Sequence, residues 1–260
     1  MRAVVARNIN VAKAVEHGQA IAAAAIGIGA WELICRWLDV PVWLLPAPSR
    51  IWTATLELAP VLPMHTLATL WAIVGGFLLA IAAAVPIAVA VVYSPLARRV
   101  LYPPLLMLQS VPKVAVAPLL LIWLGYGMHS NIVIAASIAF FPIVINTATG
   151  LESVETELLD LTRSFGSGPF KVFWKVRLPS AMPFFFSSLK VAITFAVIGA
   201  VVAEFIGGDK GLGYLILSSS GAMNTAAMFG VLVIMSVVGI ICFYAVVAAE
   251  RVLCPWYMPA

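Results

Sequence analysis

The residues that could do chemistry are few, and their spacing argues against the common catalytic sites. The segment from Gly207 to Gly211 is rich in glycine and contains Lys210, but its spacing differs from the phosphate-binding pattern G-x-x-x-x-G-K-[ST]. Ser220-Gly221 would suit a membrane serine protease only beside a histidine in a second apolar helix, and we expect the histidines outside such helices. The three cysteines lack metal or redox spacing, and His-Glu-x-x-His does not occur. We therefore predict a chain that is not an enzyme, with no catalytic residue, metal or cofactor of its own.

The densest charge in the sequence lies in residues 152–179, a segment that we call the docking loop. Apolar residues recur in its first half every three or four positions, as on one face of a helix: Val154, Leu158, Leu161 and Phe165. Gly166 is a natural end for this helix. Pro169 suits the first turn of a second short helix, which we expect to end at Leu178-Pro179.

The second short helix carries an aromatic face, which could contact a protein or lie on lipid headgroups. Its apolar members are Phe170, Phe173, Trp174 and Val176. Inner leaflets are anionic and would repel the acidic residues in the first half of the docking loop. The pattern therefore favours a protein partner.

Composition places these elements in a membrane. The chain of 260 residues is 63% hydrophobic and 10% charged, whereas soluble domains carry roughly 25% charged residues. A helix that crosses a bilayer needs about 20 mostly apolar residues. Runs of this kind cover residues 21–38, 67–92, 114–124, 132–147, 189–202 and 228–247. We predict an all-α polytopic membrane protein with about six transmembrane helices, forming a single domain over residues 1–260.

Positive charge predicts the orientation, because Lys and Arg concentrate in short cytoplasmic loops. With the N-terminus inside, all but three of the 15 Lys and Arg residues lie on or near the inner side, Lys113 and Lys190 included. The exceptions are Arg36, Arg50 and Lys210. We therefore predict that both termini are cytoplasmic and that the docking loop faces the cell interior. The net charge of +4 follows from this bias and gives no reason to expect nucleic acid.

The spacing within the docking loop resembles the cytoplasmic loop of binding-protein-dependent ABC importer permeases. That family's pattern is EAA, three residues, Gly, nine residues, Ile, any residue, Leu-Pro. Here nine residues separate Gly166 from Val176-Arg177-Leu178-Pro179, and Asp160-Leu161-Thr162 hold the EAA positions. The resemblance implies an ATPase-coupling role for one set of residues: Asp160, Leu161, Thr162, Arg163, Phe165, Gly166, Val176, Leu178 and Pro179.

The resemblance extends over most of the chain and points to the nitrate, sulfonate, taurine and bicarbonate branch of these permeases. It rests on short motifs in order along the sequence: Trp31-Glu32-Leu33, Leu45-Pro46-Ala47-Pro48-Ser49, Ser110-Val111-Pro112, Phe141-Pro142-Ile143, Asn146-Thr147, Ala203-Glu204-Phe205 and Gly211-Leu212-Gly213-Tyr214. The implied fold is the transmembrane domain of a type I ABC importer.

The resemblance also implies partners. Two copies of the chain would form the translocation pathway in a bacterial inner membrane, with both docking loops on a cytoplasmic ATPase dimer that binds ATP and Mg. An extracytoplasmic solute-binding protein would deliver the substrate, a small solute such as nitrate, a sulfonate, bicarbonate or a related organic anion. The predicted spans hold no clear ring of cations. The alternative, a secondary transporter or channel subunit, would want ionisable groups within the spans and leaves the docking loop without a role.

Several polar residues fall at membrane depth. Five of them could line a path for a small solute: Gln109, Ser110, Asn146, Thr147 and Thr194. Equally, they could hold helices together by hydrogen bonds. Glu32 is expected to pair with Arg36 one helical turn on. Lys190 is expected to reach the inner headgroups, and Ser49 could cap a helix that follows the outer prolines.

Glu204 is expected at the outer end of the fifth run. It could pair across the dimer, contact the binding protein or end a helix in water. With Gly211 and Gly213 of the following turn, it forms our candidate outer gate or binding-protein docking point. His65 and His129 are expected in outer loops.

Overall fold

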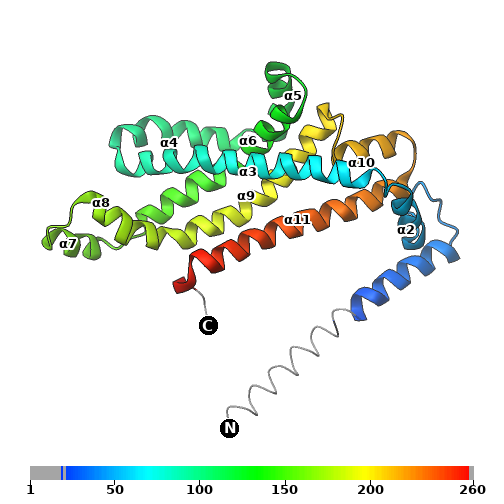
Figure 1. The fold of residues 1–260 in the computed structure, drawn as a ribbon, viewed down its shortest axis with the longest axis horizontal. Coiled ribbons are helices and arrows are strands. Elements are labelled where there is room, and N and C mark those ends of the chain that lie inside the picture. Colours follow the sequence, from blue (N-terminus) through cyan, green and yellow to red (C-terminus); the bar gives the residue numbers. More distant parts are fainter. Residues whose placement is uncertain (1–18, 20–21, 258–260) are drawn as a thin grey trace, which may run out of the picture. The chain divides into compact units, whose positions relative to one another are not determined.

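The computed structural model describes residues 19 and 22–257, apart from the side chains of Arg163 and Tyr257, and the chain divides into two compact units. The smaller unit comprises the chain up to Pro60 together with Ser218–Val231. The larger unit comprises Val61–Leu217 and the chain from Leu232 onward. Figure 1 follows the chain through its elements.

Helices make up all the regular secondary structure of the described residues, which confirms the all-α prediction. The smaller unit contains the helical residues 22–37 and α2 (Pro48–Glu57). The larger unit begins with α3 (Leu62–Tyr93), α4 (Pro95–Ser110), α5 (Lys113–Leu124), α6 (Met128–Glu152) and α7 (Thr156–Ser164). It continues with α8 (Pro169–Val172), the π-helical turn η1 (Phe173–Arg177), α9 (Leu178–Gly207) and the 3-10 turn η2 (Pro255–Tyr257). Two helices, α10 (Leu212–Gly221) and α11 (Thr225–Leu253), have residues in both units.

Four helical segments of the described chain are long and apolar enough to cross a membrane. They are α3, α6, the continuous run Pro169–Gly207 and α11. These segments contain the predicted runs 67–92, 132–147, 189–202 and 228–247, so the sequence located these four correctly. The first predicted run begins at a residue outside the described part, and its described helix covers residues 22–37.

The third predicted run does not form a span by itself, and this expectation is corrected. Residues 114–124 belong to α5, which has only 12 residues and follows α4 across a bend of 104°. The bend falls at Val111-Pro112, where Val111 is extended with φ −72° and ψ 130°. Proline lacks an amide hydrogen and forces the residue before it out of helical geometry. Figure 1 shows α5 leaving the direction of α4, and the pair counts as a fifth crossing only if it is one broken span.

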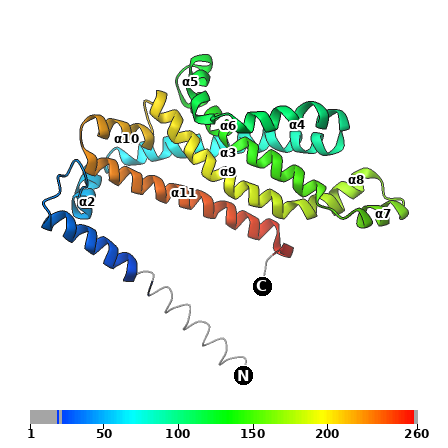
Figure 2. The ribbon, with the colours of Figure 1, turned by 180° about the vertical axis from the view of Figure 1, so that it is seen from behind.

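The core of the larger unit is built on small residues. Helix α6 lies along both α3 and α9 (Figure 2). A Cβ atom at Gly76 of α3 would approach the Cβ of Ala135 to 2.5 Å, and one at Gly199 of α9 would approach its Cα to 2.6 Å. Ala135 of α6 is fully buried. Small residues let helix backbones approach closely, which is how helices pack in a membrane without a hydrophobic driving force between them.

In the smaller unit, α2 packs on the first turns of α11. Ala54 forms a buried cluster with Ala226 and Ala227. The ring of Trp31 lies edge-on to Phe229, with centroids 6.2 Å apart. These contacts join the helix over residues 22–37, α2 and the start of α11 into one packed unit.

Candidate functional site

The first half of the docking loop is a helix with a glycine stop, as the sequence predicts. Helix α7 is followed by Gly166, whose φ of +64° lies in the left-handed region. The amide of Phe165 donates to Leu161 O at 3.2 Å, and that of Ser167 donates to Thr162 O at 3.1 Å. A Cβ at Gly166 would meet no atom within 4 Å. The position therefore needs glycine for its backbone conformation and not for space.

The second half departs from the prediction that a helix ends at Leu178-Pro179. Helix α8 does begin at Pro169, but it passes through η1 into α9 without a break. The amide of Leu178 bonds to Phe173 O, five residues back, in the wider π geometry. Proline in a regular α-helix clashes with the carbonyl four residues before it. The π turn relieves this clash, so Pro179 starts α9 instead of ending α8.

The base of the docking loop is fixed to the ends of two long helices. Arg177 Nη1 donates to Leu151 O at 3.2 Å, in the last turn of α6. Its guanidinium lies 5.3 Å from the ring centroid of Tyr93, the last residue of α3. That ring packs edge-on against Phe173, with centroids 5.9 Å apart. A cation at a helix C-terminus satisfies carbonyls that lack partners within the helix.

The docking loop also presents apolar side chains that the described part of the chain leaves exposed. Phe165 is 79% exposed and Phe170 is 76% exposed. Leu161 and Trp174 are each more than half exposed, and Trp174 packs edge-on against Phe170 with centroids 6.1 Å apart. We call these four residues the apolar tip. Exposed apolar residues on a small, braced element are typical of a protein contact.

The other predicted coupling residues lie on the same segment. Asp160, Leu161, Thr162 and Arg163 are on α7, Val176 is in η1, and Leu178 and Pro179 begin α9. The hydroxyl of Thr162 donates to Leu159 O at 2.7 Å, within its own helix. The side chain of Arg163 is outside the described residues.

Glu204 is held inside the larger unit. It is 1% exposed, and Oε1 accepts a hydrogen bond from Thr69 Oγ1 at 2.8 Å. Oε2 accepts from the amide of Gly213 at 2.7 Å. The Thr69 hydroxyl in turn accepts from the amide of Leu212 at 2.7 Å. The alternative that Glu204 ends a helix in water is therefore wrong.

The start of α10 completes this enclosure. The amide of Gly211 donates to Nδ1 of His65 at 3.0 Å, and the imidazole stacks on Tyr214 with centroids 5.8 Å apart. Three successive amides, from Gly211 to Gly213, thus bond to side chains of α3 and α9. The first amides of a helix lack partners within it, and here distant side chains supply them. We call Glu204, Thr69, His65 and these three amides the α10 clamp.

The glycines of the α10 clamp leave room for the carboxylate. A Cβ at Gly213 would lie 2.9 Å from both Cβ and Oε2 of Glu204. A Cβ at Gly211 would overlap the carboxyl group of Glu204, and its φ of +117° disfavours other residues. The structure therefore brings together Glu204, Gly211 and Gly213, which the sequence had grouped.

Sequence reasoning missed two members of the α10 clamp. His65 was expected in an outer loop, but it lies in the first turns of α3 and is buried. Thr69 follows one turn later on the same helix. That spacing of four was the available signal, since it places both side chains on one helix face. His129 lies in the first turn of α6.

The five candidate pathway residues do not form one group. Gln109 and Ser110 are exposed at the end of α4. Asn146 is exposed on α6 and donates to Pro142 O at 3.0 Å, whereas its neighbour Thr147 is buried, with a hydroxyl that has no partner among the described residues. Thr194 is exposed on α9 and lines a groove with residues of α11.

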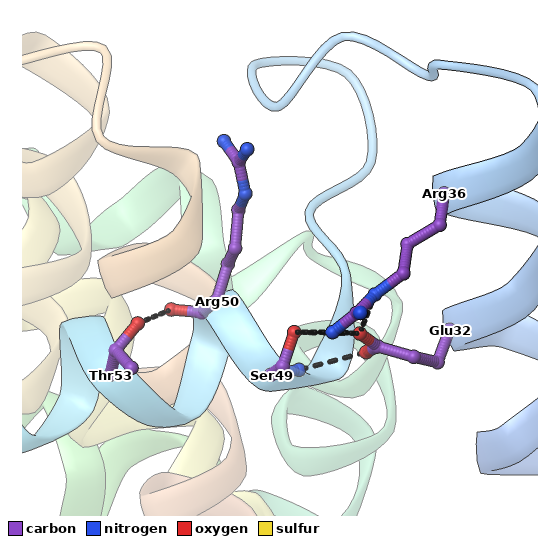
Figure 3. Close-up of polar contacts among 5 residues, drawn as sticks. All are labelled: Glu32, Arg36, Ser49, Arg50 and Thr53. Atoms are coloured by element: carbon purple, nitrogen blue, oxygen red, sulfur yellow. Dashed lines mark hydrogen bonds and ion pairs between the residues drawn. The ribbon is translucent and has the colours of Figure 1, made fainter.

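Glu32 caps a helix of the smaller unit (Figure 3). Arg36 Nε donates to its Oε1 at 2.6 Å, which confirms the predicted pair. Oε2 accepts from the amide of Ser49 at 2.9 Å, and Oε1 accepts from the Ser49 hydroxyl at 2.7 Å. Ser49 was expected to cap this helix, but Ala47 is the N-cap and Ser49 lies inside the first turn. The carboxylate of Glu32 supplies the negative charge that a helix N-terminus favours, while Arg50 points away from the cluster.

Two lysines differ from their expected places. Lys190 was expected to reach lipid headgroups, but its Nζ lies 2.8 Å from Oε2 of Glu250 on α11. Lys113 was counted with the inner loops, but its Nζ lies 4.6 Å from the ring centroid of Phe141, halfway along α6. A count of charge along the sequence reports neither contact, because it ignores which helices come together.

Comparison with known proteins agrees with this architecture. Residues 60–253 match the family described as binding-protein-dependent transport system inner membrane component. A formylaminopyrimidine transport permease of Halalkalibacterium halodurans is 33% identical over 87% of this chain and 90% of its own length. An aliphatic sulfonates transport permease of Bacillus subtilis is 32% identical over 89% of this chain and 85% of its own.

A solved structure gives the same fold. A chain of the inward-facing MetNI methionine ABC transporter superposes with a TM-score of 0.64 at 19% identity, covering 74% of this chain and 97% of that one. The fold is therefore that of a type I importer permease. On the matched residues, this chain belongs to the family of binding-protein-dependent transport system inner membrane components, the permeases of ABC transporters.

Proposed function

We propose that this chain is the membrane-spanning subunit of an ABC importer in which two copies enclose the path of a small solute. Each copy contacts one subunit of a cytoplasmic ATPase dimer, which holds ATP and Mg, and an extracytoplasmic solute-binding protein delivers the solute. The protein resides in a bacterial inner membrane with both termini and the docking loop in the cytoplasm. Residues 1–260 act as a single transmembrane domain. Family membership and the importer fold support this proposal.

The observation that carries the proposal is the construction of the docking loop. Arg177 and Tyr93 brace its base against α6 and α3, while the apolar tip stays uncovered. A braced base and an exposed tip suit an element that receives force at the tip and passes it to long helices. The EAA-like residues Asp160, Leu161 and Thr162 lie on α7, and Leu161 belongs to the apolar tip.

The proposed mechanism needs two states of the permease dimer. Closure of the ATPase dimer on ATP draws the two docking loops together, and the helices joined to them rock toward an outward-open state. A partner can shift such an equilibrium only by its different affinity for the two states. The α10 clamp ties the ends of α3 and α9 to α10, and we propose that it acts in the outer gate.

The test replaces the two most exposed aromatic residues of the apolar tip with alanine, Phe165→Ala with Phe170→Ala. The matched control is Trp43→Ala, because Trp43 is 63% exposed and lies outside the docking loop. The complex is purified through the permease, and the retained ATPase subunit and ATP-driven uptake are measured. Removing two central contact residues should lower retention by roughly tenfold or more, with the unfolding temperature unchanged. Normal retention and uptake in the double variant would contradict the proposal.

Orientation is tested separately with Ser167→Cys in intact cells. A membrane-impermeant maleimide added from outside should leave this cysteine unlabelled until the membrane is opened. Native Cys35, Cys242 and Cys254 are buried and give a low background. Labelling from outside would place the docking loop on the wrong side and end the proposal.

A further inference from the structure

Lys113 occupies an unusual position for a cation. It is the first residue of α5, directly after the 104° bend that separates α4 from α5. Its Nζ lies 4.6 Å from the ring centroid of Phe141, close to the midpoint of α6. Helix α6 is long and apolar enough to cross a membrane. The ammonium group therefore lies near the middle of a membrane-crossing helix and not at its end.

Two cations of the larger unit pair with acidic residues of other helices, whereas Lys113 has no ion pair among the described residues. Arg98 pairs with Glu152 at 3.0 Å, and Lys190 pairs with Glu250 at 2.8 Å. None of the ion pairs found in the described part of the chain includes Lys113. A cation–π contact contributes about 0.5–2 kcal/mol, whereas a lysine at the bilayer centre costs about 2.5–3.5 kcal/mol or more. The Phe141 ring alone does not offset that cost, and the described residues supply no ion pair, so a further polar or anionic partner would stabilise the ammonium group.

The surroundings of Lys113 suit an anion. Gln109 and Ser110 are exposed in the last turn of α4, at the same bend. The first turn of α5 carries no acidic residue, and its N-cap Pro112 makes no side-chain hydrogen bond. The positive end of the α5 dipole therefore adds to the charge of the ammonium group. Transporters bind charged solutes at such breaks, where unpaired backbone groups face a cavity.

We infer that Lys113 binds the anionic group of the transported solute, at the bend where Gln109 and Ser110 end α4. The inference rests on the proposed importer function and deepens it, because it assigns the substrate class. The solute carries a carboxylate, sulfonate, nitrate or similar anionic group, and an uncharged solute is excluded. Lys113 acts at the break between α4 and α5, where the path passes mid-membrane.

The first experiment measures uptake by the complete transporter in proteoliposomes. The labelled probes are nitrate, bicarbonate, ethanesulfonate and, as an uncharged solute, riboflavin. Loss of this half-buried charge should make uptake of the transported anion fall by roughly tenfold or more in Lys113→Met. Lys113→Arg keeps the charge and should retain most uptake, and Lys210→Met is the matched control at an exposed lysine. Uptake of riboflavin alone by the wild type, or normal anion uptake by Lys113→Met, overturns the inference.

The second experiment uses only the wild-type chain, so it holds even where a variant fails to fold. Lysines are acetylated in the purified transporter at alkaline pH, and the modified sites are quantified by mass spectrometry. The transported anion should slow acetylation of Lys113 several-fold compared with chloride at equal ionic strength, because a bound anion shields the nitrogen. Acetylation of Lys210 should stay constant. Equal rates at Lys113 with and without the anion overturn the inference.

The two proposals fail in different ways. Lys113 lies far along the sequence from the apolar tip, so the ATPase subunit should remain bound in every Lys113 variant. Loss of that subunit from the wild-type complex would count against the importer proposal. Retention of the subunit, together with unaltered anion uptake in Lys113→Met, counts against the anion site alone.

Discussion

The carboxylate of Glu204 accepts a 2.7 Å hydrogen bond from the amide of Gly213, nine residues later in the chain. This contact folds the glycine-rich turn back onto the end of α9 and fixes where α10 begins. Thr69 and His65 of α3 hold the two preceding amides in the same way. One buried side chain and its hydrogen-bonded neighbours therefore join three helices at one point.

Removing the carboxylate should destabilise this junction. Glu204→Ala leaves the Thr69 hydroxyl and the Gly213 amide without acceptors in a buried site, which costs about 1–3 kcal/mol for each unsatisfied group. We expect a lower unfolding temperature for the purified permease in detergent. Ser236→Ala is the control, because that hydroxyl bonds only within its own helix at 2.9 Å. An unfolding temperature like that of the wild type would show that the α10 clamp contributes nothing to stability.

Adding one methyl group to Gly213 should disturb the same junction from the other side. A Cβ there lies 2.9 Å from Cβ and Oε2 of Glu204, and overpacking of this kind costs about 1–3 kcal/mol. Gly221→Ala is the matched control on α10, since its Cβ would meet nothing within 4 Å. Gly213→Ala should therefore unfold at a clearly lower temperature than Gly221→Ala. Equal stability would mean that α10 moves away from Glu204 without penalty.

Gly166 offers a test of backbone conformation in the docking loop. Its φ of +64° is incompatible with proline, which is fixed near −65°. We expect Gly166→Pro to lose ATP-driven uptake while its membrane insertion stays normal. Gly166→Asn should retain most uptake, because asparagine visits the left-handed region at a lower cost than other residues. If Gly166→Asn and Gly166→Pro lose ATP-driven uptake to the same extent, the requirement for glycine at this position does not come from its backbone conformation.

A double-mutant cycle can measure how much the Lys190–Glu250 pair contributes to the free energy of unfolding. Removing one partner of a poorly solvated ion pair leaves the other charge uncompensated, at a cost of about 3–5 kcal/mol when burial is complete. These two side chains are 29% and 19% exposed, so a smaller effect is expected. Lys190→Met alone should lower the unfolding temperature, and adding Glu250→Leu should restore most of the loss. Additive losses in the double variant would mean that the two groups do not interact.

Local features of the structure could be predicted from the sequence because neighbouring residues determine them. The four-residue spacing of Glu32 and Arg36 predicted their pair, and Gly166 predicted the end of α7. Ser49 was assigned the wrong role because the real cap, Glu32, comes from 17 residues earlier. No local rule reports such a distant hydrogen-bond acceptor.

The features that the sequence missed depend on which helices meet. Thr69 and Glu204 are 135 residues apart, and the spacing of His65 and Thr69 on one helix face gives no sign of a partner on another helix. The contact of Lys113 with Phe141 was missed because charge was counted by position along the chain. Pro179 was read as a helix end because proline usually stops an α-helix, and only the π turn before it removes the clash.

That π turn sets the direction in which the apolar tip points. A π turn contains one residue more than the α-helical turn it replaces, and one residue rotates a helix by about 100°. Deleting a single residue from η1 would therefore turn Phe165 and Phe170 by about that angle around the axis of α9. It would also return Pro179 to a position where its ring meets a carbonyl. The turn η1 thus aims the surface that a partner must recognise, and it contributes one residue, Trp174, to that surface.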